Sequence, residues 1–200
     1  MHIVLYFGSF NPVHNGHVAI SEWVVERGLC DEIWLVVSPR NPFKTDSGLA
    51  PEEDRLAMAR IAAAESCHPQ RIVASDIEFG MPKPSYTIDT LRALEKLRPG
   101  DRFSVLIGSD NVDRIDEWKE YRTLLENYTF WVYPRPGDEN PALRPGMTLL
   151  ADAPRWDISS TGIRRELAAG EDIAGLVPPG VAAYLKTHRI WTTKNQSSGK

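Results

Sequence analysis

The first thirty residues constrain the fold more than any other part of the chain. An uninterrupted apolar run from Ile3 to Phe7 ends at Gly8, and a helical pattern follows within about ten residues. A strand that is apolar at every position is typical of one buried on both faces of a parallel sheet. Asn15 is the expected N-cap of the helix. The apolar face of this helix carries Val18, Ile20, Val24 and Val25. The order of strand, glycine turn and helix is typical of a phosphate-binding unit.

Two histidines lie in the opening turn of that helix. His14 and His17 are three residues apart, so both imidazoles can face the same ligand. Unpaired backbone N–H groups and the helix dipole stabilise an anion there. Gly8 and Gly16 are expected to let a phosphate approach the backbone, and imidazole donors can follow charge that develops on phosphorus. The pattern is neither a P-loop nor a dinucleotide-binding glycine motif.

Further apolar runs predict the rest of a sheet. Strands are expected at residues 33–38, 71–75, 102–108, 128–133 and 147–150. Helices are expected to begin near residues 51, 87, 160 and 179, and the proline-rich segment 134–146 is expected to be irregular and solvent-facing. Strand, helix and strand at this spacing imply parallel pairing with right-handed crossovers. We therefore predict an α/β fold with a Rossmann-like open, mostly parallel twisted sheet and helices on both faces.

Composition excludes several classes of protein. The chain has 200 residues, with 23 basic and 27 acidic side chains and a net charge of −4, so no overall positive field attracts nucleic acid or a membrane. Cys30 and Cys67 are too few for a disulfide scaffold. No apolar run approaches the about 20 residues of a membrane span. We expect a cytoplasmic protein with a single domain over residues 1–191 and a disordered tail over 192–200. Exposed helices and the 6 tryptophans leave room for a homo-oligomer.

Other candidate residues lie where the predicted strands end. Ligands of open α/β sheets bind at the carboxyl edge of the strands. Lys44 lies in a loop after the second strand, where it can reach phosphate, although a solvated lysine would look the same. Asp110 follows the fourth strand and can accept from ribose hydroxyls. Trp118 can stack on a flat heteroaromatic ring, or it can simply pack against a helix.

A second anion site is expected near residue 160. The hydroxyls of Ser159, Ser160 and Thr161 precede a helix. Arg164 lies on the same face as these hydroxyls and can bind phosphate oxygens with its guanidinium. Taken alone, this segment is better explained by a plain helix cap with a solvated arginine.

Two motifs carry a resemblance to a known family. Gly8-x-Phe10-x-Pro12-x-His14-x-Gly16-His17 resembles the H-x-G-H signature of the nucleotidyltransferase superfamily, in the form seen in nicotinate-nucleotide adenylyltransferases. The run I-S-S-T-x-I-R that ends at Arg164 resembles the second motif of that superfamily, and Ser85-Tyr86-Thr87 resembles the S-Y-T segment of the family. The resemblance implies adenylyl transfer from ATP to nicotinate mononucleotide, which gives nicotinate adenine dinucleotide and pyrophosphate. It also implies Mg²⁺ on the ATP phosphates.

The resemblance implies roles for individual residues as well. It implies that His14 and His17 are the catalytic pair that stabilises the transferring phosphoryl group. The implied ATP-binding residues are Gly8, Ser9, Phe10, Gly16, His17, Lys44, Gly108, Asp110, Ile158, Ser160, Thr161 and Arg164. The implied residues for the acceptor nucleotide are Lys44, Tyr86, Thr87, Asp110 and Trp118. No residue is assigned to a protein-bound metal.

Several alternatives stay open at this point. Acid and amide pyridine nucleotides differ by one carboxylate, so a nicotinamide-mononucleotide adenylyltransferase is an alternative. Pantetheine-phosphate adenylyltransferases are another, although they usually carry threonine where this chain has His14. A non-catalytic ATP-binding regulatory module is an alternative from a different class. A zinc site would need about three or four ligands, and Cys30, Cys67, His68 and His188 show no paired ligand spacing.

Overall fold

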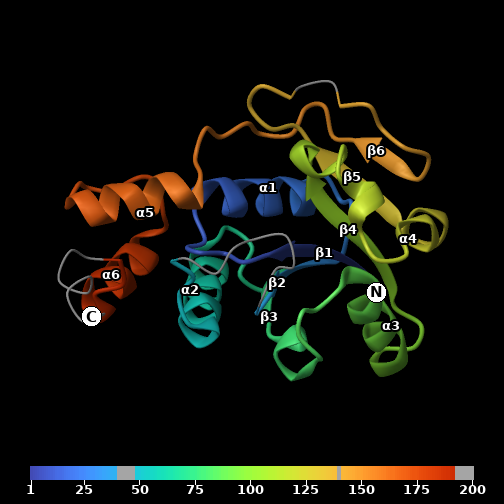
Figure 1. Cartoon of the computed structure of the whole chain (residues 1–200), viewed down its shortest axis with the longest axis horizontal. Helices are drawn as coiled ribbons and strands as arrows, with labels where there is room; N and C mark the ends of the chain where they lie inside the picture. Colours follow the sequence, from blue (N-terminus) through green and yellow to red (C-terminus); the bar gives the residue numbers. More distant parts are fainter. Residues whose placement is uncertain (40–47, 139–140, 192–200) are drawn as a thin grey trace.

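A sheet of parallel strands lies at the centre of the structure (Figure 1). The computed structural model describes residues 1–39, 48–138 and 141–191. Its strands are β1 (His2–Gly8), β2 (Glu32–Val37), β3 (Ile72–Ser75), β4 (Arg102–Gly108), β5 (Thr129–Tyr133) and β6 (Met147–Leu149). They follow the order β3-β2-β1-β4-β5-β6, and every pairing between them is parallel. The predicted Rossmann-like sheet is confirmed.

The path of the chain creates a switch point in the middle of this sheet. From β1, the chain adds β2 and β3 on one side through α1 (Asn15–Glu26) and α2 (Glu52–Glu65). It then passes through α3 (Thr87–Leu97) to β4, on the other side of β1. The connections that leave β1 and β4 therefore run in opposite directions. Open α/β sheets bind ligands in the crevice at such a point.

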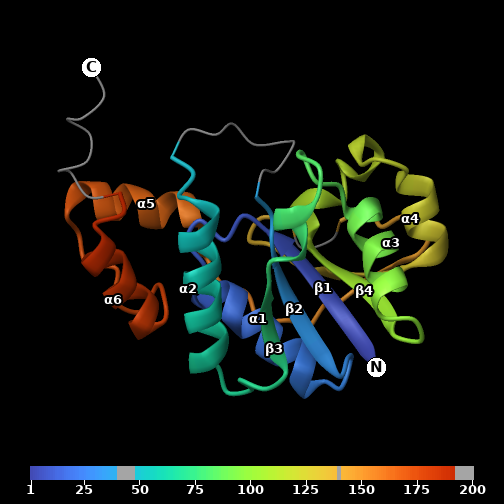
Figure 2. The ribbon, with the colours of Figure 1, turned by 90° about the horizontal axis from the view of Figure 1, so that it is seen from below.

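The residues of β1 alternate between two hydrophobic cores. Val4 and Tyr6 belong to the core that includes α1, α2, α5 (Ser160–Ala169) and α6 (Pro179–His188). Ile3 and Leu5 belong to the core that includes α3 and α4 (Tyr121–Asn127). A strand covered on both faces needs an apolar side chain at every position, which explains the uninterrupted run in the sequence. Figure 2 shows α2, α5 and α6 at one end of the molecule and α3 and α4 at the other.

Most boundaries of helices and strands agree with those predicted from the sequence, and the differences have local causes. Each predicted strand is found within one residue at either end. The N-cap of α1 is His14 rather than Asn15, because His14 has an extended backbone (φ −143°) and Asn15 is already helical. The sequence does not predict α4 or the 3₁₀ turns, because they are too short for a helical period. These turns are η1 (Ile77–Gly80), η2 (Ser109–Asn111) and η3 (Ile115–Glu117).

Some predictions concern residues that the structure describes only in part or not at all. Lys44 and the expected tail, residues 192–200, are not among the residues that the structure describes. In the segment 134–146, residues 142–146 are exposed and irregular as predicted, but the prediction that the whole segment faces solvent is wrong at its start, where Pro134 is buried and Arg135 is partly buried against the cleft. Within the described ranges, no helix is both long and apolar enough to cross a membrane.

Because β1 lies inside the sheet and is covered on both faces, a cavity beside it should strongly lower the free energy of unfolding. Leu5 is fully buried, and replacing it with alanine should lower the free energy of unfolding by about 2–5 kcal/mol. Leu97, at the end of α3, is 66% exposed, so Leu97→Ala is the matched control and should cost far less. Urea unfolding of the two variants measures the difference. Equal losses in the two variants would contradict the two-sided burial of β1.

Candidate active site

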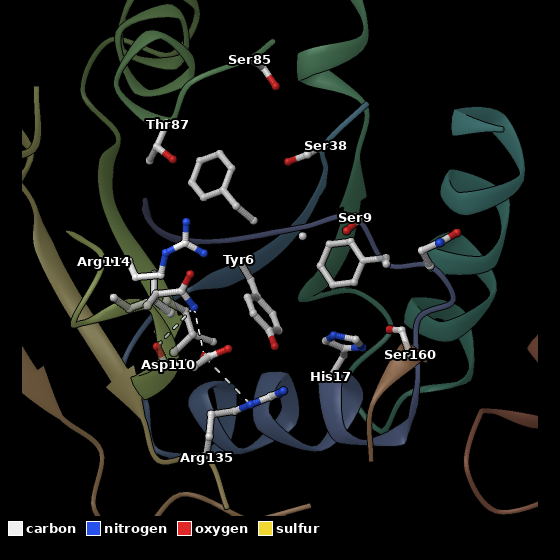
Figure 3. A pocket seen from close by; sticks show the side chains of 18 of the residues that line it. Tyr6, Ser9, His17, Ser38, Ser85, Thr87, Asp110, Arg114, Arg135 and Ser160 are labelled. Carbon is white, nitrogen blue, oxygen red and sulfur yellow. Dashed lines mark hydrogen bonds and ion pairs between the residues drawn. The ribbon is translucent and has the colours of Figure 1, made fainter. Parts of the chain in front are cut away.

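A cleft with a volume of about 430 Å³ lies at the carboxyl ends of β1 and β4. Figure 3 shows Ser9, His17 and Ser160 at one end of this cleft and Ser85 and Thr87 at the other. The cleft therefore opens at the switch point of the sheet, between segments that are far apart in the sequence.

His14 and His17 form a close, tilted ring pair at the start of α1. The two ring centroids are 3.6 Å apart, with an angle of 30° between the planes. The backbone N–H of His14 donates to Nδ1 of His17 over 3.1 Å. Because Nδ1 of a neutral His17 accepts this bond, its proton lies on Nε2. The pair thus presents a fixed donor from the first turn of the helix to the cleft.

His14 is an uncharged group in the folded protein. Its side chain is 3% exposed, and its Nδ1 has no hydrogen-bond partner among the described residues. Burial, and secondarily the positive charge of Arg135, lower the pKa of His14 from 6.5 to about 3. A neutral imidazole still carries one N–H donor, so His14 can donate to an anion without itself bearing charge.

The second motif contacts the first through hydrogen bonds across the cleft mouth. Ser159 caps α5 by accepting from the N–H of Gly162 over 3.0 Å. Ser160 Oγ donates to the carbonyl oxygen of Pro12 over 2.9 Å. Arg164 Nη1 donates to the carbonyl oxygen of Asn11 over 2.8 Å, and burial lowers the pKa of this guanidinium. The two segments that the sequence singled out therefore form one end of the cleft, which we call the phosphate end.

The opposite end of the cleft is lined by aromatic and hydroxyl side chains. Tyr86 and Thr87 lie at the start of α3, and Trp118 follows η3. Trp118 is partly buried and makes an edge contact with Phe130, with ring centroids 6.3 Å apart. Lys119 lies 5.1 Å from the centre of the Tyr86 ring. A flat ring bound at this end, which we call the aromatic end, would meet both an indole and a phenol.

Comparison with known proteins agrees with this arrangement. The cytidylyltransferase-like family matches residues 5–166 of the chain. A protein of Flavobacterium johnsoniae named "Probable nicotinate-nucleotide adenylyltransferase" is 41% identical over 194 residues, which cover 96% of this chain and 99% of that protein. A protein of Cytophaga hutchinsonii with the same name is 40% identical, with 96% and 99% covered. This chain belongs to the nicotinate-nucleotide adenylyltransferase family.

Solved structures support the fold of this adenylyltransferase family member. The structure titled "Plasmodium falciparum nicotinic acid mononucleotide adenylyltransferase complexed with NaAD" superposes with a TM-score of 0.81. The two sequences are 22% identical, and the match covers 95% of this chain and 97% of the other. At this identity, the similarity establishes the fold.

Most of the sequence-predicted site residues of the adenylyltransferase line the cleft. They are Gly8, Ser9, Phe10, His14, His17, Tyr86, Thr87, Gly108, Asp110, Trp118, Ser160, Thr161 and Arg164. Gly16 and Ile158 do not line the cleft and instead border a small neighbouring cavity beside Trp156. Lys44 lies outside the described residues.

The glycines of the first motif lie in close contact with neighbouring side chains. A Cβ atom on Gly8 would lie 3.0 Å from the Phe10 ring, and one on Gly16 would lie 3.1 Å from the His14 ring. The space beside Gly8 is therefore filled by Phe10, and the space beside Gly16 by His14 and Trp156. Phe10 also has a φ of 44°, in the left-handed region. The absence of a Cβ at both glycines lets these side chains pack against the backbone of the loop.

Sequence reasoning missed several cleft residues of the adenylyltransferase. Arg135 lies two residues after the end of β5, and its Nε lies 4.0 Å from Asp110 Oδ1 (Figure 3). The hydroxyls of Tyr6 and Tyr133 lie 2.7 Å apart, and burial raises the pKa of both. The strand-end rule that pointed to Asp110 could have found Arg135, but prolines on both sides of it suggested an irregular segment. The tyrosines looked like ordinary strand residues.

A buried carboxylate was also missed. Glu78, in η1, is 2% exposed and lines the cleft. It accepts hydrogen bonds from the Ser85 hydroxyl over 2.6 Å and from the Thr90 hydroxyl over 2.8 Å. The carboxylate therefore ties the turn before α3 to the first turn of that helix. The sequence around an isolated glutamate in a loop does not predict such hydrogen bonds.

The neutral His14 predicts a pH dependence of stability. The folded imidazole stays unprotonated down to about pH 3, whereas the unfolded chain takes up a proton near pH 6.5. The contribution of this group to stability should be complete above pH 6.5 and be lost as the pH falls toward 3. His14→Gln removes the titrating group, so its free energy of unfolding should fall less than that of the wild type on acidification. Urea unfolding at a series of pH values measures both slopes.

The control for this experiment is His188→Gln. His188 is exposed at the end of α6, so this variant should keep the wild-type slope. If His14→Gln also kept that slope, His14 would not be the buried neutral group described above.

Proposed function

We propose that the protein transfers the adenylyl group of ATP to nicotinate mononucleotide and releases pyrophosphate. The observation that carries this proposal is that one cleft joins a phosphate end, built from two anion-binding motifs, to an aromatic end. The names of the family's relatives support the same reaction. In this reaction an oxygen of the mononucleotide phosphate attacks the α-phosphorus of ATP, and the bond to the β-phosphate oxygen breaks. Positioning and charge stabilisation carry such a transfer, so no protein nucleophile is needed.

The phosphate end supplies donors for the transferring and leaving groups. His14 and His17 present N–H groups to the α-phosphate, where negative charge builds up during in-line attack. Ser160, Thr161 and Arg164 bind the leaving pyrophosphate. Ser9, Phe10 and the N-terminus of α1 complete this end.

The aromatic end binds the acceptor. The pyridine ring stacks on Trp118, next to Tyr86 and Thr87. Asp110 lines the cleft, is exposed and can accept from ribose hydroxyls. Gly108 precedes it and lines the same wall of the cleft.

Mg²⁺ is proposed to enter with ATP. Among the described residues, no group of three or more histidine, cysteine, aspartate and glutamate side chains could hold a metal ion. The oxygen donors of the second motif, Ser160 and Thr161, are neutral hydroxyls suited to phosphate. We propose that the ion is held by phosphate oxygens and water, where it neutralises charge on the triphosphate.

Other features of the protein are proposed from its sequence and its single sheet. We propose that residues 1–191 form one domain, because all described strands join the same sheet. A cytoplasmic location and a homo-oligomeric state are further proposals that rest on composition.

Replacing His17 with alanine tests the catalytic pair. His17→Ala should lower kcat by about 10²- to 10³-fold, the usual loss for one donor to a developing oxyanion. Pyrophosphate release at saturating ATP measures it. His68, outside the cleft, gives the control variant His68→Ala, which should retain wild-type kcat. An unchanged kcat in His17→Ala would remove His17 from the mechanism.

The acceptor is identified by a parallel assay. Pyrophosphate release is measured from ATP and Mg²⁺ with nicotinate mononucleotide, nicotinamide mononucleotide or phosphopantetheine. We expect the highest kcat/KM with the nicotinate acid. Preference for another acceptor would leave the phosphate end intact and overturn the proposed role of the aromatic end. If ATP binds but no pyrophosphate is released with any of the three acceptors, the result would favour a regulatory nucleotide-binding module.

A further inference from the structure

Arg55 is a buried arginine in the opening turn of α2. It is 1% exposed, and it is among the largest of the fully buried side chains. Arginine is almost never buried unless its charge and its donors are satisfied. Nothing in the two sequence motifs points to it, because an arginine after three acidic residues looks like part of a solvated helix start.

The Arg55 guanidinium binds backbone carbonyls from three separate segments. Nε donates to Ala50, the residue before the N-cap of α2, over 2.9 Å. Nη1 donates to Ser9, in the loop after β1, over 2.8 Å and to Ser38, after β2, over 2.7 Å. Nη2 donates to Pro39 over 3.0 Å. One side chain thus fixes the loops at the carboxyl ends of β1 and β2.

Two of these carbonyls belong to residues that line the cleft. Ser9 and Ser38 both face it, as Figure 3 shows. Since Nη1 lies within hydrogen-bond distance of both carbonyls, the guanidinium lies directly behind this wall. A displacement of Arg55 would move the wall that carries Ser9 and, through it, the loop that leads to His14.

The partners of Arg55 among the described residues are neutral backbone carbonyls. Among the described residues, no carboxylate forms an ion pair with it, and Glu52 instead binds Lys83 over 2.8 Å. Burial lowers the pKa of the guanidinium, while the nearby Glu52 and Glu53 raise it, and arginine stays protonated in proteins. Among the described residues this buried charge is held by neutral carbonyls, and such a charge acts over several ångströms because the surrounding dielectric constant is low.

We propose that Arg55 is a positioning residue that holds the Ser9 and Ser38 wall in place and supplies a fixed positive charge behind the phosphate end. This inference rests on the proposed binding of ATP in the cleft. A purely structural arginine would affect all ligands of the cleft alike. A charge behind the phosphate end contributes more to binding as each phosphate adds negative charge to the ligand.

The test compares the binding of adenosine, AMP, ADP and ATP without Mg²⁺ by isothermal titration calorimetry. In Arg55→Gln, which removes the charge, the Kd for adenosine should stay within about two-fold, whereas the Kd for ATP should rise roughly 10- to 100-fold. AMP and ADP should lie between them. Arg60, on the same helix, is exposed and gives the matched control Arg60→Gln, which should bind all four ligands as the wild type does.

A second variant covers the case in which Arg55→Gln does not fold. Arg55→Lys keeps the charge but cannot span four carbonyls with a compact ammonium. Its ratio of ATP to adenosine affinity should match the wild type, while kcat for pyrophosphate release should fall at least about ten-fold because the wall is misplaced. Circular dichroism and thermal melting establish that each variant is folded.

Three outcomes would overturn the proposal. They are an equal loss of affinity for all four ligands in Arg55→Gln, no loss in that variant, and wild-type kcat in Arg55→Lys. Failure of the proposed function would look different. In that case the wild type would release no pyrophosphate, and the binding series would still report on the charge of Arg55.

Discussion

Three backbone carbonyls of one short loop hold the phosphate end together. The loop between β1 and α1 has no ladder of its own to satisfy these oxygens. Ser9 accepts from Arg55 of α2, Asn11 accepts from Arg164 of α5, and Pro12 accepts from Ser160 of α5. Each donor belongs to a helix that follows the loop at a distance in sequence. The loop can take its tight course around Phe10 because these helices hold it from outside.

The sheet and the main motifs could be predicted from the sequence, because they depend on local patterns. Strands buried on both faces, such as β1, must be apolar throughout, and this signal is independent of tertiary detail. His14, His17 and Arg164 were found because a helix start and its first turn are also local. The N-cap was misassigned because asparagine is favoured there in general, whereas here the backbone of His14 takes the extended conformation.

The remaining parts of the site could not be predicted, because they depend on contacts between distant segments. Arg55 and Glu78 look like surface residues, and only the folded chain brings carbonyls or hydroxyls to them. The low pKa of His14 follows from burial and from the charge of Arg135, which lies 121 residues later in the sequence. Gly16 and Ile158, which the sequence motifs place in the ATP site, border a small neighbouring cavity in the folded chain.

The two ends of the cleft are built by different stretches of chain. The loop after β1, together with α5, makes one end, and η1, the start of α3 and the turn at Trp118 make the other. The hydrogen bonds of Ser160 and Arg164 to the loop do not involve the turn that Glu78 organises. Mutations can therefore accumulate at one end while the other keeps its geometry. A fold divided in this way can change its acceptor during evolution without rebuilding its adenylyl-transfer apparatus.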